Sequence, residues 1–271
     1  MFINRILPIR RYITKTNNFV KRIDHLDKFF FKVHELIPVC DVLGGKLVRI
    51  GNKKGDGGYV MLDEFDSNNI AYSFGICDDV SWDKDIVSRG IHCYMYDHTI
   101  SHLPENNDLF HWQKKGIGGV EAKSPLFSLE RLIIDNGHLN NNKLILKIDV
   151  EGAERESLLE LPNSILEQFE QIVIELHNLS DREYAFTNLS LMSKLLETHT
   201  PIHIHANNCA GFTCIDDLIV PDALEVTYVR TNDHKFRKSS YFYPREIDVV
   251  NTAEHDDIIV GLWNIPSSCF Y

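Results

Sequence analysis

Two carboxylates and a glycine directly follow an apolar run in the middle of the chain. Residues 143–148 read Lys-Leu-Ile-Leu-Lys-Ile, and Asp149, Glu151 and Gly152 come next. A fully buried strand reads as a continuous apolar run, and ligands of open α/β sheets bind beyond the carboxyl ends of the strands. Acidic groups at this place can therefore take part in chemistry. The alternative is that Asp149 caps a helix beginning near Ala153.

Two further groups of polar side chains are expected at the same edge of the sheet. Glu175 and His177 end one predicted strand, and His205, Asn207 and Asn208 end another. Such carboxylate, imidazole and amide groups can bind a divalent metal such as Mg²⁺, or a histidine can act as a general base without one. The candidate catalytic residues are Asp149, His177 and His205, and the candidate metal ligands are Asp149, Glu175 and His177.

A cofactor site is predicted where two earlier strands end. The first ends in Tyr72-Ser-Phe-Gly75-Ile76, and the second ends at Asp97. A glycine at a strand end lets the backbone approach a ligand closely. An acidic residue about 20 positions further on binds the ribose in dinucleotide folds, and Asp97 stands at about that distance from Gly75.

The glycine fingerprint of dinucleotide folds is absent after this first strand. Asp78, Asp79 and Asp83 stand in its place, and carboxylates there would repel a pyrophosphate. They suit a ligand that joins adenosine to a cationic sulfonium and ammonium, and S-adenosylmethionine is that ligand. An NAD-dependent oxidoreductase is therefore the alternative enzyme, and a solvated turn is the alternative interpretation of Asp78 and Asp79.

The elements that must position these residues alternate along the chain. Strands are predicted over residues 46–50, 59–62, 71–76, 92–96, 109–116, 144–150, 171–176, 202–205 and 224–230, and helices over 24–37, 83–89, 128–135, 153–161 and 188–197. This alternation predicts an α/β fold with a doubly wound, mainly parallel sheet. The last two strands have no helix-length segment between them, so they are predicted to be antiparallel. The predicted domains are an N-terminal helical cap (1–45), the core (46–230) and a C-terminal extension packed on the core (231–271).

Composition limits the class of protein. The 271 residues are 44% hydrophobic and 25% charged, with a net charge of −11, which argues against a nucleic acid as the main partner. Residues 1–23 are basic, and either touch an anionic membrane or phosphorylated substrate or form a flexible end. The six cysteines lack a Cys-x-x-Cys pair and are expected to be reduced thiols. No signal-peptide pattern or membrane-spanning run is found, so a cytoplasmic location is expected.

Several of these segments resemble one enzyme family. Tyr72-Ser-Phe-Gly-Ile76, Tyr96-Asp97, the helix Ser128–Leu132 and above all Leu146-Lys-Ile-Asp-Val-Glu-Gly-Ala-Glu154 resemble the FkbM-type S-adenosylmethionine-dependent methyltransferases. Residues 55–60 (Gly-Asp-Gly-Gly-Tyr-Val) and 201–208 (Pro-Ile-His-Ile-His-Ala-Asn-Asn) look like a methyltransferase-like branch related to that family. The resemblance covers roughly residues 46–230.

The resemblance implies a seven-stranded, Rossmann-like class I methyltransferase sheet and roles for particular residues. Asp97 would hold the cofactor's ribose, and Asp149 and Glu151 would lie near the transferred methyl group. The other residues implied to bind the cofactor are Asp56, Gly57, Gly58, Phe74, Gly75 and Ile76. The turn at residues 55–58 can fold over the cofactor or serve only as a hairpin turn.

Members of this family commonly methylate hydroxyl groups, so the expected activity is O-methyl transfer to a small molecule. The expected partner is a sugar, a nucleotide-linked sugar or a related compound, and a homo-oligomer stays open. A methyltransferase-like binding protein without turnover is the non-enzymatic alternative. Four aromatic residues can stack on a sugar or adenine, or belong to the core: Trp82, Trp112, Tyr184 and Phe212.

Overall fold

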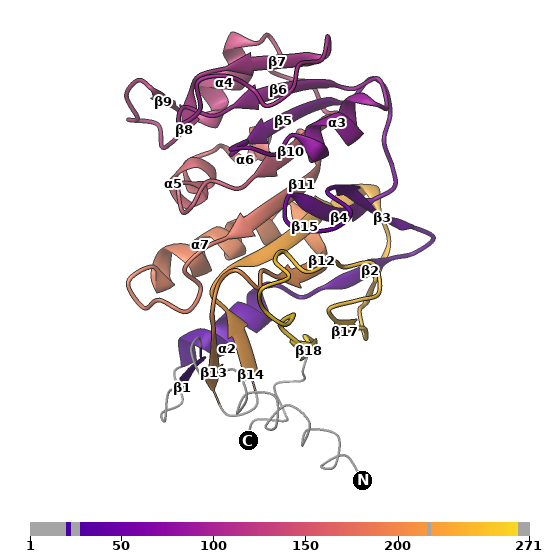
Figure 1. Cartoon of the computed structure of the whole chain (residues 1–271), viewed down its shortest axis with the longest axis vertical. Coiled ribbons are helices and arrows are strands. Elements are labelled where there is room, and N and C mark those ends of the chain that lie inside the picture. Colours follow the sequence, from indigo (N-terminus) through magenta and orange to yellow (C-terminus); the bar gives the residue numbers. More distant parts are fainter. Residues whose placement is uncertain (1–19, 23–27, 216–217, 265–271) are drawn as a thin grey trace.

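The computed structural model describes residues 20–22, 28–215 and 218–264. A seven-stranded sheet forms its centre, with the strand order β12-β15-β11-β10-β5-β6-β7. Figure 1 shows these strands stacked from β7 at one end to β12 at the other. The strands are β5 (Ile70–Phe74), β6 (His92–Tyr96), β7 (Phe110–Gln113), β10 (Leu144–Ile148), β11 (Phe169–Leu176), β12 (His199–Ala206) and β15 (Leu224–Arg230).

The sheet is mainly parallel, and its last strand in the sequence is antiparallel. β10 pairs in parallel with β5 and β11, so that Ile148 lies opposite both Phe74 and Ile174. β6 continues the parallel part from β5 to β7, whereas β15 is antiparallel to β11 and β12. These pairings confirm the predicted α/β class with a mainly parallel sheet and are consistent with a Rossmann-like fold. Because the chain runs outward from β5 through β6 to β7 and then returns to β10, the topological switch lies between β5 and β10.

The two faces of the sheet carry different layers. The helices are α2 (Lys28–Leu36), α3 (Ser81–Val87), α4 (Leu129–Asp135), α5 (Glu154–Leu159), α6 (Asn163–Leu166) and α7 (Ala185–Leu196). Because side chains alternate along a strand, Leu144, Leu146 and Ile148 join the core formed with α2 and α4 to α7. Ile145 turns to the other face, where it packs in a core with α3 and the hairpin of β3 (Leu47–Gly51) and β4 (Gly58–Leu62).

Shorter strands surround this core. β1 (Val20–Arg22), β13 (Phe212–Ile215) and β14 (Leu218–Pro221) form one small sheet; the β13–β14 hairpin lies beyond β12 in Figure 1 and was not predicted. The remaining pairs are β2 (Cys40–Val42) with β16 (Phe236–Lys238), β8 (Gly116–Ile117) with β9 (Leu126–Phe127), and β17 (Phe242–Tyr243) with β18 (Gly261–Leu262).

The N-terminal cap stays a prediction. α2 lies within the helix predicted over 24–37 and packs against α7. Residues 1–19 and 23–27, which make up most of the predicted extension, lie outside the described residues. No helix in the described part of the chain is long and apolar enough to cross a membrane.

Candidate functional site

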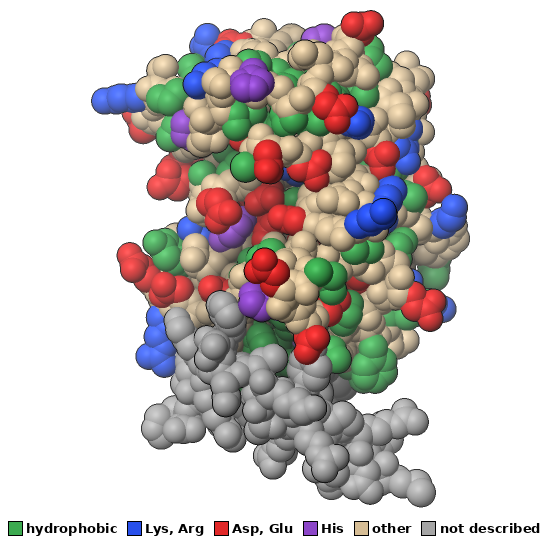
Figure 2. Space-filling view, viewed as in Figure 1, with side chains coloured by type: hydrophobic (Ala, Val, Ile, Leu, Met, Phe, Trp, Pro, Cys, Tyr) green, Lys and Arg blue, Asp and Glu red, His purple; other side chains and the backbone are tan. Residues whose placement is uncertain are grey.

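A cavity of about 920 Å³ opens at the carboxyl ends of β5, β6 and β10. Figure 2 shows acidic side chains and a histidine gathered around a hollow between α5 and β4. Eight of the nine residues predicted to bind the cofactor line the cavity: Asp56, Gly57, Phe74, Gly75, Ile76, Asp97, Asp149 and Glu151. Gly58, the ninth, begins β4 and is not part of the lining.

Gly75 brings two strand ends into contact at the switch point. Its φ of +79° lies in the left-handed region, and an added Cβ would stand 1.6 Å from the carbonyl oxygen of Asp149. Any larger residue would therefore push β5 and β10 apart. Lys147 Nζ donates to the Gly75 carbonyl at 2.7 Å, so the lysine that interrupts the apolar run of β10 fixes the turn at the end of β5.

Asp97 organises the same turn from the end of β6. Its Oδ2 accepts hydrogen bonds from the backbone N–H groups of Ile76 and Cys77, and its Oδ1 accepts from the N–H and hydroxyl of Thr99. Burial alone would raise the pKa of Asp97, but these bonds outweigh it and lower the pKa. A ribose hydroxyl would have to share these oxygens with the turn, so the ribose role of Asp97 stays a prediction.

The glycine-rich turn before β4 closes one side of the cavity. Asp56 N–H donates to the Asn251 carbonyl at 3.0 Å, and Asn251 Nδ2 donates to Asp56 Oδ1 at 2.9 Å. The same Nδ2 donates to Glu225 Oε1 on β15 at 2.7 Å. Asn251 therefore ties the turn to the central sheet, and it also lines the cavity. No local pattern in the sequence marks Asn251 for this role, because its partners are about 195 and 26 residues away.

Tyr59 holds one oxygen of Asp149. Its hydroxyl donates to Asp149 Oδ2 at 2.9 Å. Burial, together with the charges of Asp149 and Glu225, raises the pKa of Tyr59 well above its usual value, so the phenol remains a donor. Tyr59 lines the cavity beside Asp149 and is a residue to which the sequence analysis assigned no role.

His177 stands among four carboxyl groups. Its Nε2 lies 3.5 Å from Glu151, 3.7 Å from Asp149 and 3.8 Å from Glu175, and its Nδ1 lies 3.6 Å from Glu154. Burial lowers the pKa of His177, but the carboxylates of Glu154, Asp149 and Glu151 outweigh burial and raise it. The structure thus places Asp149, Glu151 and Glu175, which were expected at the same edge of the sheet, beside His177, and it adds Glu154.

The surroundings of Glu175 argue against its predicted role as a metal ligand. It is buried, and burial with the charges of Asp149 and Glu225 raises its pKa well above the usual value, which favours the protonated acid. Asn207 Nδ2 also donates to its Oε1 at 2.8 Å. The group whose atoms lie within 4.8 Å of one another is Asp149, Glu151 and His177; Glu151 replaces Glu175 in it.

His205 belongs to a separate buried cluster and does not line the cavity. Its Nδ1 lies 3.3 Å from Glu225 and its Nε2 lies 3.4 Å from Asp257. Burial lowers the pKa of His205, but these carboxylates raise it to about 10. The resulting imidazolium has no free lone pair, so in this state His205 cannot take up a proton from a substrate.

The acidic residues after β5 have three different surroundings. Asp78 is exposed and lines the cavity. Asp79 also lines it and accepts from the backbone N–H and the hydroxyl of Ser81. Asp83 is buried and does not line the cavity, and Cys93 Sγ donates to it at 3.3 Å. Trp82 lines the cavity, whereas the other aromatic candidates Trp112, Tyr184 and Phe212 do not.

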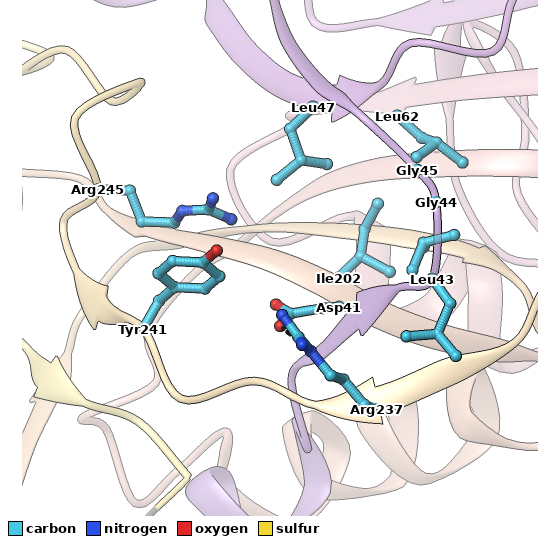
Figure 3. A pocket seen from close by; sticks show the side chains of 11 residues that line it. Asp41, Leu43, Gly44, Gly45, Leu47, Leu62, Ile202, Arg237, Tyr241 and Arg245 are labelled. Atoms are coloured by element: carbon cyan, nitrogen blue, oxygen red, sulfur yellow. Dashed lines mark hydrogen bonds and ion pairs between the residues drawn. The ribbon is translucent and has the colours of Figure 1, made fainter.

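A second pocket, of about 290 Å³, lies beside β2, β3 and β16. Figure 3 shows Arg237 paired with Asp41 and the guanidinium of Arg245 near the Tyr241 ring. Arg237 Nε donates to Asp41 Oδ2 at 3.0 Å, and Arg245 Cζ lies 3.9 Å from the centroid of the ring. No residue predicted to be functional lines this pocket, so it is separate from the candidate site.

No family model matches this chain, and a search of the curated proteins finds no match.

Proposed function

We propose that the chain is an S-adenosylmethionine-dependent O-methyltransferase that methylates a hydroxyl of a small molecule such as a sugar or nucleotide-linked sugar. The observation that carries the proposal is the acidic cavity at the switch point of the sheet. Its volume of about 920 Å³ is within the range of small-molecule sites. Its acidic lining residues are Asp56, Asp78, Asp79, Asp97, Asp149 and Glu151, against the single lysine Lys147.

This charge favours a cationic ligand over a dinucleotide. Lys147 already donates to the Gly75 carbonyl, and Asp79 accepts from the N–H of Ser81 at the start of α3. A pyrophosphate would therefore meet a carboxylate where dinucleotide folds offer free N–H groups. The sulfonium and ammonium of S-adenosylmethionine are compatible with the same lining.

The chain's own residues can orient an acceptor and receive its proton. S-adenosylmethionine, when bound, supplies a methyl group that moves to the acceptor oxygen while the carbon–sulfur electron pair stays on sulfur. Tyr59 fixes Asp149 through Oδ2 and leaves Oδ1 on the side of His177. Asp149 lines the cavity and His177 does not, so we assign proton uptake to Asp149 and support of its charge to His177.

Calorimetry with S-adenosylhomocysteine tests the cofactor part of the proposal. We expect the wild type to bind it and not NAD. We expect Asp97→Ala to bind at least about tenfold more weakly, a loss of about 1.4 kcal/mol, because the turn at Ile76 and Cys77 loses its acceptor. Asp108→Asn changes an exposed carboxylate on the same β6–β7 connection and should bind like the wild type. Absence of binding, or preference for NAD, would refute the proposal.

Transfer of labelled methyl groups tests the catalytic part. A panel of sugars and nucleotide-linked sugars is incubated with the protein and labelled S-adenosylmethionine. Product formation that is lost in Asp149→Asn supports the enzyme, whereas binding of S-adenosylhomocysteine without product from any acceptor supports a binding protein.

A further inference from the structure

The geometry points to a site for one divalent first-row transition metal on Asp149, Glu151 and His177, and we propose that this ion binds the acceptor hydroxyl. The binding of the ion does not depend on the proposed function. The role of the ion in methyl transfer rests on the proposed function.

The donor atoms are nearly as close as the ligands of one ion. Donor atoms about 2.1 Å from an ion are about 3.0 to 3.4 Å apart when the bonds meet at right or tetrahedral angles. His177 Nε2 lies 3.5 Å from Glu151 Oε2 and 3.7 Å from Asp149 Oδ1, and one ligand atom from each residue lies within 4.8 Å of the others. These separations are too long for direct hydrogen bonds. Glu151 has an 89% exposed side chain, so it can rotate to complete the set.

The imidazole is held in position for coordination. The His177 side chain is 10% exposed, and no hydrogen bond in the described structure involves its Nε2. Its other nitrogen faces Oε1 of the fully buried Glu154 at 3.6 Å. Glu154 Oε2 in turn accepts from the Gly152 N–H at 2.7 Å. A carboxylate behind the far nitrogen is the usual support of a metal-binding histidine.

The local charge also favours a bound cation. Four carboxyl groups lie within 4 Å of one imidazole, and the guanidinium of Arg155 is the cation beside them, 3.5 Å from Glu154. The four are Asp149, Glu151, Glu154 and Glu175. Glu175 favours the protonated form, and packing the other three carboxylates this closely is costly unless a positive charge lies beside them. A dication bound to Nε2 would supply that charge in place of the imidazolium proton.

The donor types select the class of metal. Carboxylate oxygens suit Mg²⁺, Ca²⁺ and Mn²⁺, whereas an imidazole nitrogen suits first-row transition metals. A mixed set of two carboxylates and one imidazole therefore favours Mn²⁺ or Zn²⁺ over Mg²⁺. An acceptor hydroxyl bound to such an ion would lose its proton more readily, which reduces the demand on Asp149 as a base.

Titration of metal-free protein with MnCl₂, followed by the electron paramagnetic resonance signal of free Mn²⁺, tests the site. We expect one ion per chain in the wild type and at least tenfold weaker binding in both Asp149→Asn and Glu151→Gln. Because the Glu151 side chain is exposed, its substitution leaves the fold intact even if Asp149→Asn does not. Glu156→Gln removes an exposed carboxylate of α5 and should bind like the wild type.

Three results would overturn the inference. They are no Mn²⁺ binding by the wild type, equal weakening in Glu156→Gln, and displacement of Mn²⁺ by an equal concentration of Mg²⁺. The titration contains no S-adenosylmethionine, so its failure leaves the binding of S-adenosylhomocysteine as an independent measure of the proposed function.

Discussion

Tyr59 and Lys147 lie side by side in the cavity wall, and each donates a hydrogen bond to a residue at the end of a strand. The Tyr59 hydroxyl donates to Asp149, and the Lys147 ammonium lies 5.8 Å from the centre of the Tyr59 ring while it donates to Gly75. Lys147 therefore carries a buried positive charge next to the acidic rim, where it is also close to Asp83. These contacts explain why Lys147, a charged residue, stands inside the apolar strand β10.

Removing the Tyr59 hydroxyl should weaken both the fold and the site. Tyr59→Phe keeps the ring and deletes the donor to Asp149, so we expect the free energy of unfolding to fall by about 1 to 2 kcal/mol. Urea unfolding measures the change. If labelled methyl transfer is detected, we expect it to fall as well, because Asp149 loses its fixed orientation.

Tyr241→Phe is the matched control for this substitution. Tyr241 is 45% exposed and stacks under Arg245 in the second pocket, far from Asp149 in its contacts. Equal destabilisation by the two substitutions would contradict the role given to the Tyr59 hydroxyl.

Residues 244–257 form a segment that is fastened across β12 and β15 by side chains. His203 pairs with Asp248 at 2.7 Å, and His205 lies between Glu225 and Asp257. Asn208 Nδ2 donates to the carbonyls of Thr252 and His255. Asn251 lies in this segment and binds Asp56, so the attachment of the segment to the sheet also sets the position of the glycine-rich turn.

The fastening at His205 should depend on pH. The pKa of His205 rises from 6.5 in the unfolded chain to about 10 in the folded protein. A raised pKa means that its contribution to stability is complete below pH 6.5 and is lost as the pH rises toward 10. We expect the free energy of unfolding at pH 6 to be about 3 kcal/mol lower in His205→Gln than in the wild type, because Glu225 and Asp257 lose their cation.

Urea unfolding from pH 6 to 10 checks this expectation. The wild type should lose stability over that range more steeply than His205→Gln, and His102→Gln, at an exposed position, should follow the wild type. Parallel pH profiles for the wild type and His205→Gln would contradict the assigned charge.

Local patterns were sufficient for the sheet but not for its attachments. β6 has the predicted ends, and β5, β10 and β11 differ from prediction by a few residues, because alternation and apolar runs reflect burial in the strand itself. The β13–β14 hairpin and the 244–257 segment depend on distant partners. Asp149 and His177 could be predicted together because each lies at the end of a predicted strand. The roles of Asn251 and Tyr59 depend on partners far along the chain, so they could not be predicted. The polar end of β12 gave no sign that His205 would be ion-paired and buried.

The cavity lies where the hydrophobic cores on the two faces of the sheet meet. Phe74 belongs to the core shared with α4 to α7 and lines the cavity, and Trp82 does the same from the core on the other face. Trp82 Nε1 donates to Met61 Sδ of β4 at 3.3 Å. The walls of the site are therefore part of the packing that stabilises the protein.

Truncating the buried Phe74 should lower the free energy of unfolding more than truncating an exposed phenylalanine. Phe74 is fully buried, so Phe74→Ala is expected to lower the free energy of unfolding by about 3 to 5 kcal/mol. Phe186 on α7 is 81% exposed, and Phe186→Ala should change it by less than about 0.5 kcal/mol. Chemical denaturation compares the two, and a similar cost for both would mean that the wall at Phe74 is not packed as described.

The placement of β15 between β11 and β12 bears on the order in which a growing polypeptide can assemble. While residues before 224 are still being added, the place of β15 between β11 and β12 is empty, and the glycine-rich turn that borders the cavity lacks its anchor Asn251. Asn251 is translated some 27 residues after β15 begins. A nascent chain can therefore complete this side of the cavity only after residue 251 has been added, and a chain released between residues 231 and 250 would hold all seven strands of the central sheet without the anchor of the turn.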